Sequence, residues 1–113
     1  MQIKNSNDKG VLVLSLFGRL TMDSEELLVE RVKKVADGGA RRLLVDLSGV
    51  DYVDSHGLGQ MVAAHNLLGS LGGQIRFAGV SSKLQALLEM THLPRVLHVD
   101  ANRETSVAKL RGS

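Results

Sequence analysis

The sequence predicts a single α/β domain, with a mixed sheet of four or five strands and helices largely on one face. Three observations carry this prediction: short apolar runs typical of buried strands, apolar stripes at helical spacing between them, and a length of 113 residues, which supports one core. Strands that alternate with helices tend to pair in parallel, because parallel neighbours need crossover connections.

The first 40 residues predict a hairpin followed by a helix. The run 11–17 is almost continuously apolar, which suits a strand covered on both faces, and it pairs with the segment 3–4. Asp23 and Glu26 have the spacing of a capping box. They predict a helix that ends at the glycine pair 38–39. Its apolar stripe comprises Leu28, Val32, Val35 and Ala36.

The middle of the chain predicts a short buried strand, a loop and a second helix. Residues 43–45 form the strand, which ends at Asp46, and the pair 48–49 has the composition of a turn. The loop continues to Asp54. An apolar stripe then predicts a helix from Gly57 to Leu71. The stripe comprises Leu58, Met61, Val62, His65 and Leu68.

A third strand at 75–78 and a third helix come next. Ser81 or Ser82 caps the helix, because a serine oxygen accepts a hydrogen bond from an unpaired amide of the first turn. Pro94 ends it, since proline cannot continue a helical hydrogen-bond ladder. The apolar stripe of this helix comprises Leu84, Leu87, Leu88 and Thr91.

The C-terminal part predicts a fifth strand and a fourth helix. Residues 96–99 form an edge strand, and residues 102–110 form a short amphipathic helix with Val107 and Leu110 facing inward. We therefore place the domain at residues 1–110. Residues 111–113 are set aside as a C-terminal tail that resembles the remnant of an expression tag.

The composition argues against several classes of protein. The chain has no cysteine, which excludes disulfides, thiol nucleophiles and cysteine-based zinc sites. The four histidines lack the spacing of metal ligands, so we expect no metal and no cofactor. We expect His65 to be partly buried and hydrogen-bonded.

A formal net charge of +2, spread along the chain, disfavours direct nucleic-acid binding. No apolar run approaches the roughly 20 residues of a membrane span, and the N-terminus lacks a signal-peptide segment, so we expect a cytoplasmic protein.

The segment 54–59, DSHGLG, points to regulation. Ser55 stands where a loop becomes a helix, so its simplest role is that of an N-cap. Gly57 and Gly59 leave little bulk around its hydroxyl, although a glycine within a helix costs about 1 kcal/mol relative to alanine. A phosphate on Ser55 would lie over the positive end of the helix and add a charge of about −1.5 to −2 beside Asp54. Partner binding would then be lost without unfolding.

The run 43–59, LLVDLSGVDYVDSHGLG, resembles the signature of the STAS domain, specifically that of the bacterial anti-sigma factor antagonists. The segment 73–80, GQIRFAGV, resembles the next strand of that family. The resemblance implies a STAS-like fold and a cycle of partner switching. In this cycle the unphosphorylated antagonist binds an anti-sigma factor that is also a serine kinase. Phosphorylation at the position of Ser55 ends the binding, and a serine phosphatase restores it.

The resemblance also implies which residues bind the partner. Asp46 either takes part or accepts amide hydrogen bonds from the loop. His56 departs from the family pattern, in which Ser, Thr or Ala often follows the serine, and a bulky imidazole here alters which kinase fits. The sequence leaves the oligomeric state open, including a homodimer. The full set comprises Asp46, Asp54, Ser55, His56, Gly57, Leu58 and Gly59.

Two other functions are weighed against the switch. A serine hydrolase needs its three groups to converge from separate chain positions, whereas Asp54, Ser55 and His56 are adjacent, and the segment lacks the first glycine of G-x-S-x-G. We therefore expect no enzyme activity. The second is a STAS domain that never cycles and serves as a scaffold subunit of a stress-signalling or lipid-transport complex. The intact Asp54-Ser55-x-Gly57 pattern favours switching.

Overall fold

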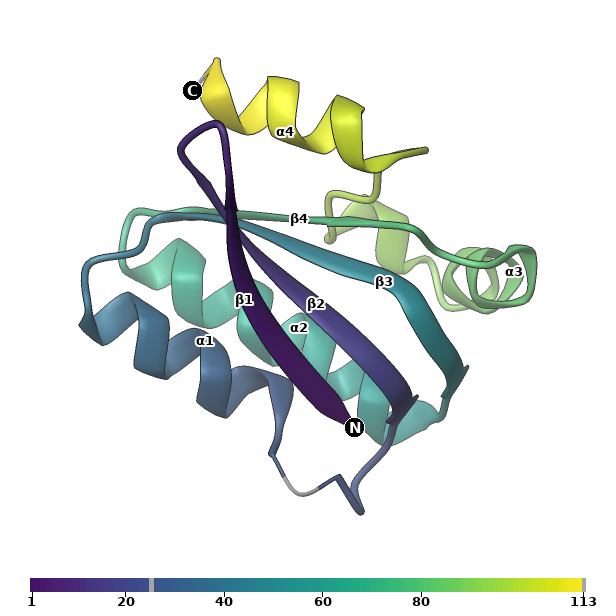
Figure 1. Cartoon of the computed structure of the whole chain (residues 1–113). Coiled ribbons are helices and arrows are strands. Elements are labelled where there is room, and N and C mark those ends of the chain that lie inside the picture. The colour runs from purple at the N-terminus through teal and green to yellow at the C-terminus, as the bar shows by residue number, and fades with distance from the viewer. Residues whose placement is uncertain (25, 113) are drawn as a thin grey trace.

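The computed structural model describes residues 1–24 and 26–112, which form a four-stranded mixed sheet flanked by helices (Figure 1). The strand order is β1-β2-β3-β4, with β1 antiparallel to β2 and the other two pairs parallel. The predicted fold class is confirmed. The strands are β1 Gln2–Asp8, β2 Val11–Leu20, β3 Arg42–Val53 and β4 Gln74–Ala78. The helices are α1 Leu28–Asp37, α2 Ser55–Ser70, α3 Ser82–Met90 and α4 Arg103–Arg111, with a 3₁₀ turn at Leu93–Arg95.

Most of the helical packing lies on one side of the sheet (Figure 1). α1 and α2 cover one face, and α3 lies beside the carboxyl ends of β3 and β4 while adding Leu84 and Leu88 to the same core. α4 covers the opposite face, where Val107 and Leu110 pack in a second apolar cluster. The predicted inward orientation of these two residues is confirmed. Helices therefore lie largely on one face, with α4 as the exception.

β3 is longer than its apolar run predicts. The predicted loop 47–54 is strand as far as Val53, because β2 extends to Leu20 and pairs with it in parallel through two register shifts. The predicted turn at 48–49 is therefore wrong. Gly49 instead allows the Phe17 side chain of β2 to pack closely against β3, since a Cβ on Gly49 would lie 2.5 Å from Cδ1 of Phe17.

α1 begins at Leu28, so the capping box predicted at 23–26 is wrong. The Leu27 amide instead donates to Oε1 of Glu30 at 3.0 Å. The Leu28 amide donates to Oε1 of Gln60 on α2 at 2.8 Å. A contact between two helices thus fixes where α1 starts, and the local spacing of acidic residues carries no information about it.

Residues 96–99 do not form the predicted fifth strand. A single parallel bridge between Phe77 and Val99 joins this segment to β4, through two backbone hydrogen bonds of 2.8 Å. Val96 keeps helical backbone angles after the 3₁₀ turn. The extended stretch that remains is therefore too short to continue the sheet.

The other helix boundaries differ less from prediction. Ser81 caps α3, as expected, since its hydroxyl accepts a hydrogen bond from an amide of the first turn at 3.1 Å. The helix ends at Met90, so the stop predicted at Pro94 comes too late. α4 continues through Arg111 and crosses the boundary that we placed after residue 110. Ser113 lies outside the described residues.

Asp100 is buried between β4 and α4, with 2% of its side chain exposed. It accepts hydrogen bonds from Arg76 at 2.6 Å, Ser106 at 2.6 Å and Lys109 at 3.1 Å. Burial alone would raise the pKa of Asp100, but these three donors outweigh burial and hold the pKa well below its ordinary range. The cluster fastens α4 to the edge of the sheet.

His65 on α2 is half-buried, as predicted, but the expected hydrogen bond is missing at one ring nitrogen. Its Nδ1 is buried and has no partner among the described residues. The ring of His98 lies 5.8 Å away between centroids. Burial, and after it the charge of His98, lower the pKa of His65 below its ordinary value.

The protein is therefore expected to lose stability as the pH falls below about 6.5. Unfolded chains bind a proton at His65 near this pH, whereas the folded state resists protonation. Stability is thus fully present above the unfolded pKa and declines below it. Urea unfolding at about pH 7.5 and about pH 5 measures this loss of stability. The loss should shrink in His65→Asn. It should persist in the control His92→Asn, because His92 is exposed. Equal losses of stability in both variants would show that His65 does not cause the pH dependence.

Candidate functional site

Ser55 is the first residue of α2, and its side chain is exposed. It does not cap the helix, so that prediction is wrong. The cap is Asp54, whose Oδ1 accepts a hydrogen bond from the Gly57 amide at 2.9 Å. The Ser55 hydroxyl makes no hydrogen bond with any described residue. It is therefore available to a partner or an enzyme.

The two neighbouring residues should differ in their effect on stability. We expect Asp54→Ala to lower the free energy of unfolding by about 1 kcal/mol, through the lost cap. Ser55→Ala should change it by less than about 0.5 kcal/mol, as for other surface substitutions. Urea unfolding of both variants measures the difference. A larger loss in Ser55→Ala than in Asp54→Ala would show that the cap is assigned to the wrong residue.

Gly57 brings the first turn of α2 directly against the end of β2. A Cβ on Gly57 would clash with the carbonyl oxygen of Leu20 and would lie 2.8 Å from Cγ1 of Val53. Leu58 is also buried, whereas Gly59 is exposed with open space around it. The motif thus divides into residues that position the turn and residues that form its outer surface.

The outer surface of this turn carries both charge and unpaired amides. Nδ1 of the exposed His56 lies 3.8 Å from Oδ2 of Asp54, so the two form an ion pair only when the imidazole is protonated. The backbone amides of Ser55 and His56 have no acceptor among the described residues. Free amides and the positive end of the helix dipole together stabilise an anion at this position.

The structure does not bring Asp46 to this turn. Asp46 pairs with Ala78 across β3 and β4, and eight residues of extended chain, about 26 Å, separate it from Asp54. Its Oδ1 accepts a hydrogen bond from the Ser48 amide at 3.0 Å, and its Oδ2 lies 3.6 Å from Nη1 of Arg103 on α4. These contacts agree with the second role considered for Asp46, that of an acceptor for nearby amides.

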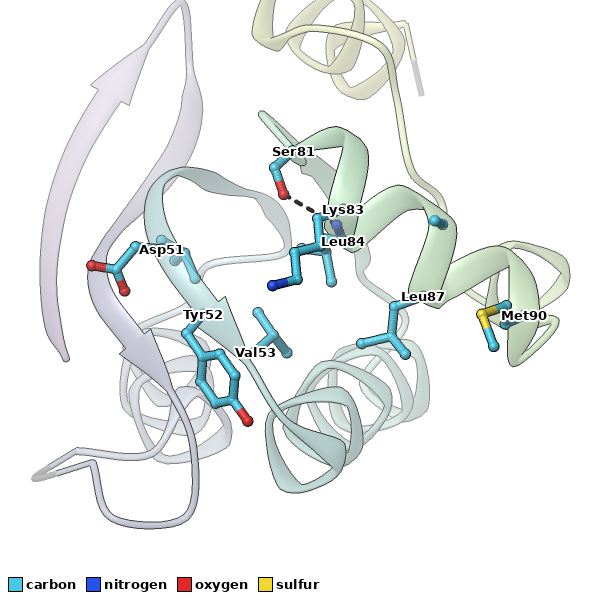
Figure 2. A pocket seen from close by; sticks show the side chains of 10 residues that line it. Asp51, Tyr52, Val53, Ser81, Lys83, Leu84, Leu87 and Met90 are labelled. Carbon is cyan, nitrogen blue, oxygen red and sulfur yellow. Dashed lines mark hydrogen bonds between the residues drawn. The ribbon is translucent and has the colours of Figure 1, made fainter.

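Two hollows flank the first turn of α2. One, of about 280 Å³, lies between the end of β3 and α3 and has Val53 in its wall (Figure 2). The other, of about 480 Å³, lies beside the end of β2 and has Asp54 in its wall. In the second hollow the Arg19 guanidinium lies over the ring of Tyr52, 4.7 Å from its centroid. No sequence motif marks these hollows, because their residues come from separate elements.

Among the residues that the structure describes, no group of three or more histidine, aspartate or glutamate side chains is placed to hold a metal ion. No helix within residues 1–24 and 26–112 has both the length and the hydropathy needed to cross a membrane.

Comparison with known proteins places the fold and the motif in one family. The sequence model of the STAS domain matches residues 2–106. The chain belongs to the STAS domain family. Within that family, this STAS domain is 29% identical over 104 residues to the anti-sigma-B factor antagonist of Bacillus subtilis (strain 168), which covers 92% of each chain. The predicted resemblance is thereby confirmed.

Solved structures share the fold of this STAS domain. An anti-sigma factor antagonist from Mycobacterium paratuberculosis superposes with a TM-score of 0.86 at 20% identity, over 97% of this chain and 93% of that one. Unphosphorylated SpoIIAA, also an anti-sigma factor antagonist, superposes with a TM-score of 0.72 at 16% identity, over 99% and 100% of the two chains. Its phosphorylated form gives 0.70 at 15% identity, over 96% and 99%. At these identities the likeness shows the fold alone.

Proposed function

We propose that this STAS domain is an anti-sigma factor antagonist whose partner binding is switched by phosphorylation of Ser55. One observation carries the proposal: an exposed serine with a free hydroxyl opens α2 within the motif DSHG. Its unphosphorylated form binds an anti-sigma factor with serine kinase activity in the cytoplasm. Phosphorylation releases that partner, and a serine phosphatase restores binding. The names of the curated relatives support the proposal.

The geometry explains how a phosphate acts without unfolding the domain. Placed on Ser55, it lies next to the free amides and the positive end of α2, which favour an anion. It also adds a charge of about −1.5 to −2 to a surface that already carries the Asp54 carboxylate. A partner that packs closely on this turn is then repelled, so the switch is electrostatic.

The same geometry argues against a catalytic role for the motif. Asp54 uses Oδ1 to hold the Gly57 amide, and Ser55 has no hydrogen bond to His56. A serine nucleophile needs a hydrogen-bonded base that is itself oriented by a third group. Ser55 therefore acts in this proposal as a phosphate acceptor for another enzyme.

A Ser55→Asp substitution tests the electrostatic switch. We expect it to weaken binding of the cognate anti-sigma factor by at least about tenfold. Thermal stability should stay close to that of the wild type, since an acidic residue is favoured in the first turn of a helix. Titration calorimetry and thermal melting measure the two quantities.

Ser6→Asp serves as the matched control, because it adds the same charge at an exposed position of β1. Its affinity for the anti-sigma factor should equal that of the wild type. Unchanged binding by Ser55→Asp, or equal losses in both variants, would contradict the proposed switch.

A further inference from the structure

The hollow between the end of β3 and α3 is an apolar groove (Figure 2). Its volume is about 280 Å³. Two large apolar side chains beside it stay in solvent: Met90 is 78% exposed and Tyr52 is 44% exposed. The other apolar side chains that line it are Val50, Val53, Leu84, Ala86 and Leu87.

One positive charge faces this groove. Figure 2 shows the ammonium group of Lys83 directed toward the space above Val53, while the carboxylate of Asp51 turns away. Lys83 has no ion pair or hydrogen bond with the described residues. The groove is thus complementary to an apolar side chain that has a carboxylate beside it.

The exposed apolar side chains beside the groove favour a protein side chain as its occupant. Anchors at protein interfaces are single side chains that fill small desolvated pockets. Tyrosine and methionine, which stand here at the surface, are enriched at such interfaces.

The groove is continuous with the turn that carries Ser55. Val53 lines the groove and lies two residues before Ser55. Its Cγ1 also packs against the position of Gly57, where a Cβ would approach to 2.8 Å. A partner that covers the Ser55 hydroxyl therefore reaches the groove without crossing another element.

We propose that the groove anchors the anti-sigma factor. It receives an apolar side chain from an amphipathic helix of that kinase, and a carboxylate on the same helix pairs with Lys83. The inference rests on the proposed function of Ser55 and adds the chemistry of the partner. The groove supplies affinity, and Ser55 supplies the control.

Two substitutions on exposed positions of α3 test the anchor. Ala86→Glu places a carboxylate in the groove, and Lys83→Glu reverses its charge. Purified serine kinases of the anti-sigma type from the same organism serve as probes, with affinity measured by titration calorimetry. Both variants should bind at least about tenfold more weakly than the wild type.

Matched controls carry the same changes away from the groove. Ala108→Glu lies on α4 and Lys34→Glu on α1, both at exposed positions. They should bind within about twofold of the wild type, as is typical of positions outside an interface. Thermal melting of all four variants confirms that each is folded.

The outcomes separate the anchor from the switch. Groove variants that bind like their controls would overturn the anchor and leave the role of Ser55 intact. A wild-type protein that no kinase binds or phosphorylates would overturn both proposals. Self-association of the wild type that the groove variants abolish, with kinase binding unchanged, would assign the groove to a second copy of the chain and also overturn the anchor.

Discussion

Replacing Asp100 by alanine is expected to lower the free energy of unfolding by about 3 kcal/mol or more. The substitution removes the carboxylate that accepts hydrogen bonds from Arg76, Ser106 and Lys109. The Arg76 side chain is only 16% exposed and Ser106 is fully buried, so both lose a hydrogen-bond acceptor at a site that is largely shielded from water. Urea unfolding at neutral pH measures the loss.

Asp37→Ala is the matched control for Asp100→Ala. Asp37 also pairs with a lysine, Lys33, at 3.1 Å, but both side chains are about two-thirds exposed. Exposed pairs of this kind contribute roughly 0 to 1 kcal/mol. Similar losses in the two aspartate variants would mean that burial of Asp100 has no energetic consequence, and would contradict the account.

Gly57→Ala is expected to destabilise the domain by about 3 kcal/mol, the upper part of the range for overpacked sites. The added methyl group meets the carbonyl oxygen of Leu20 and the side chain of Val53, and both belong to strands of the sheet. Neither strand can shift without disturbing the core. The first turn of α2 therefore moves away from the sheet, and phosphorylation of Ser55 should slow as well.

Gly59→Ala isolates the steric effect from the change of residue type. Gly59 lies in the same helix, and a Cβ on it would meet open space. Alanine is favoured over glycine inside a helix by about 0.5 to 1 kcal/mol, so this variant should be more stable than the wild type. Thermal melting of both variants gives the comparison. A Gly57→Ala protein as stable as Gly59→Ala would refute the close approach to Leu20.

The periodicity of apolar residues is sufficient to predict most of the fold. The strands at 11–17 and 75–78 can be predicted because they are covered on both faces and therefore form short apolar runs. The stripes of α1 and α4 can be predicted because burial on one face of a helix repeats at a fixed spacing. The end of β3 cannot be predicted from the pattern of apolar residues. Residues 48–53 are mostly exposed or half-buried, and they remain in the sheet only because β2 extends beside them.

The candidate site was also predictable only in part. The motif locates the start of α2, because its residue types and order are specific to the family. It does not distinguish Asp54 from Ser55 as the cap, since both residue types are favoured at that position. Side chains that come from other elements, such as Arg19 and Lys83, join the site only through the packing of β2 and α3 around the turn.

The intact mass of the protein after incubation with ATP and candidate serine kinases from the same organism tests whether Ser55 is the phosphorylated switch. We expect the addition of a single phosphate, located on Ser55 by peptide mapping and absent from Ser55→Ala. Because that substitution leaves the cap at Asp54 in place, the control protein remains folded. A phosphate that persists in Ser55→Ala, or a wild-type mass that no kinase changes, would rule out Ser55 as the phosphorylated switch.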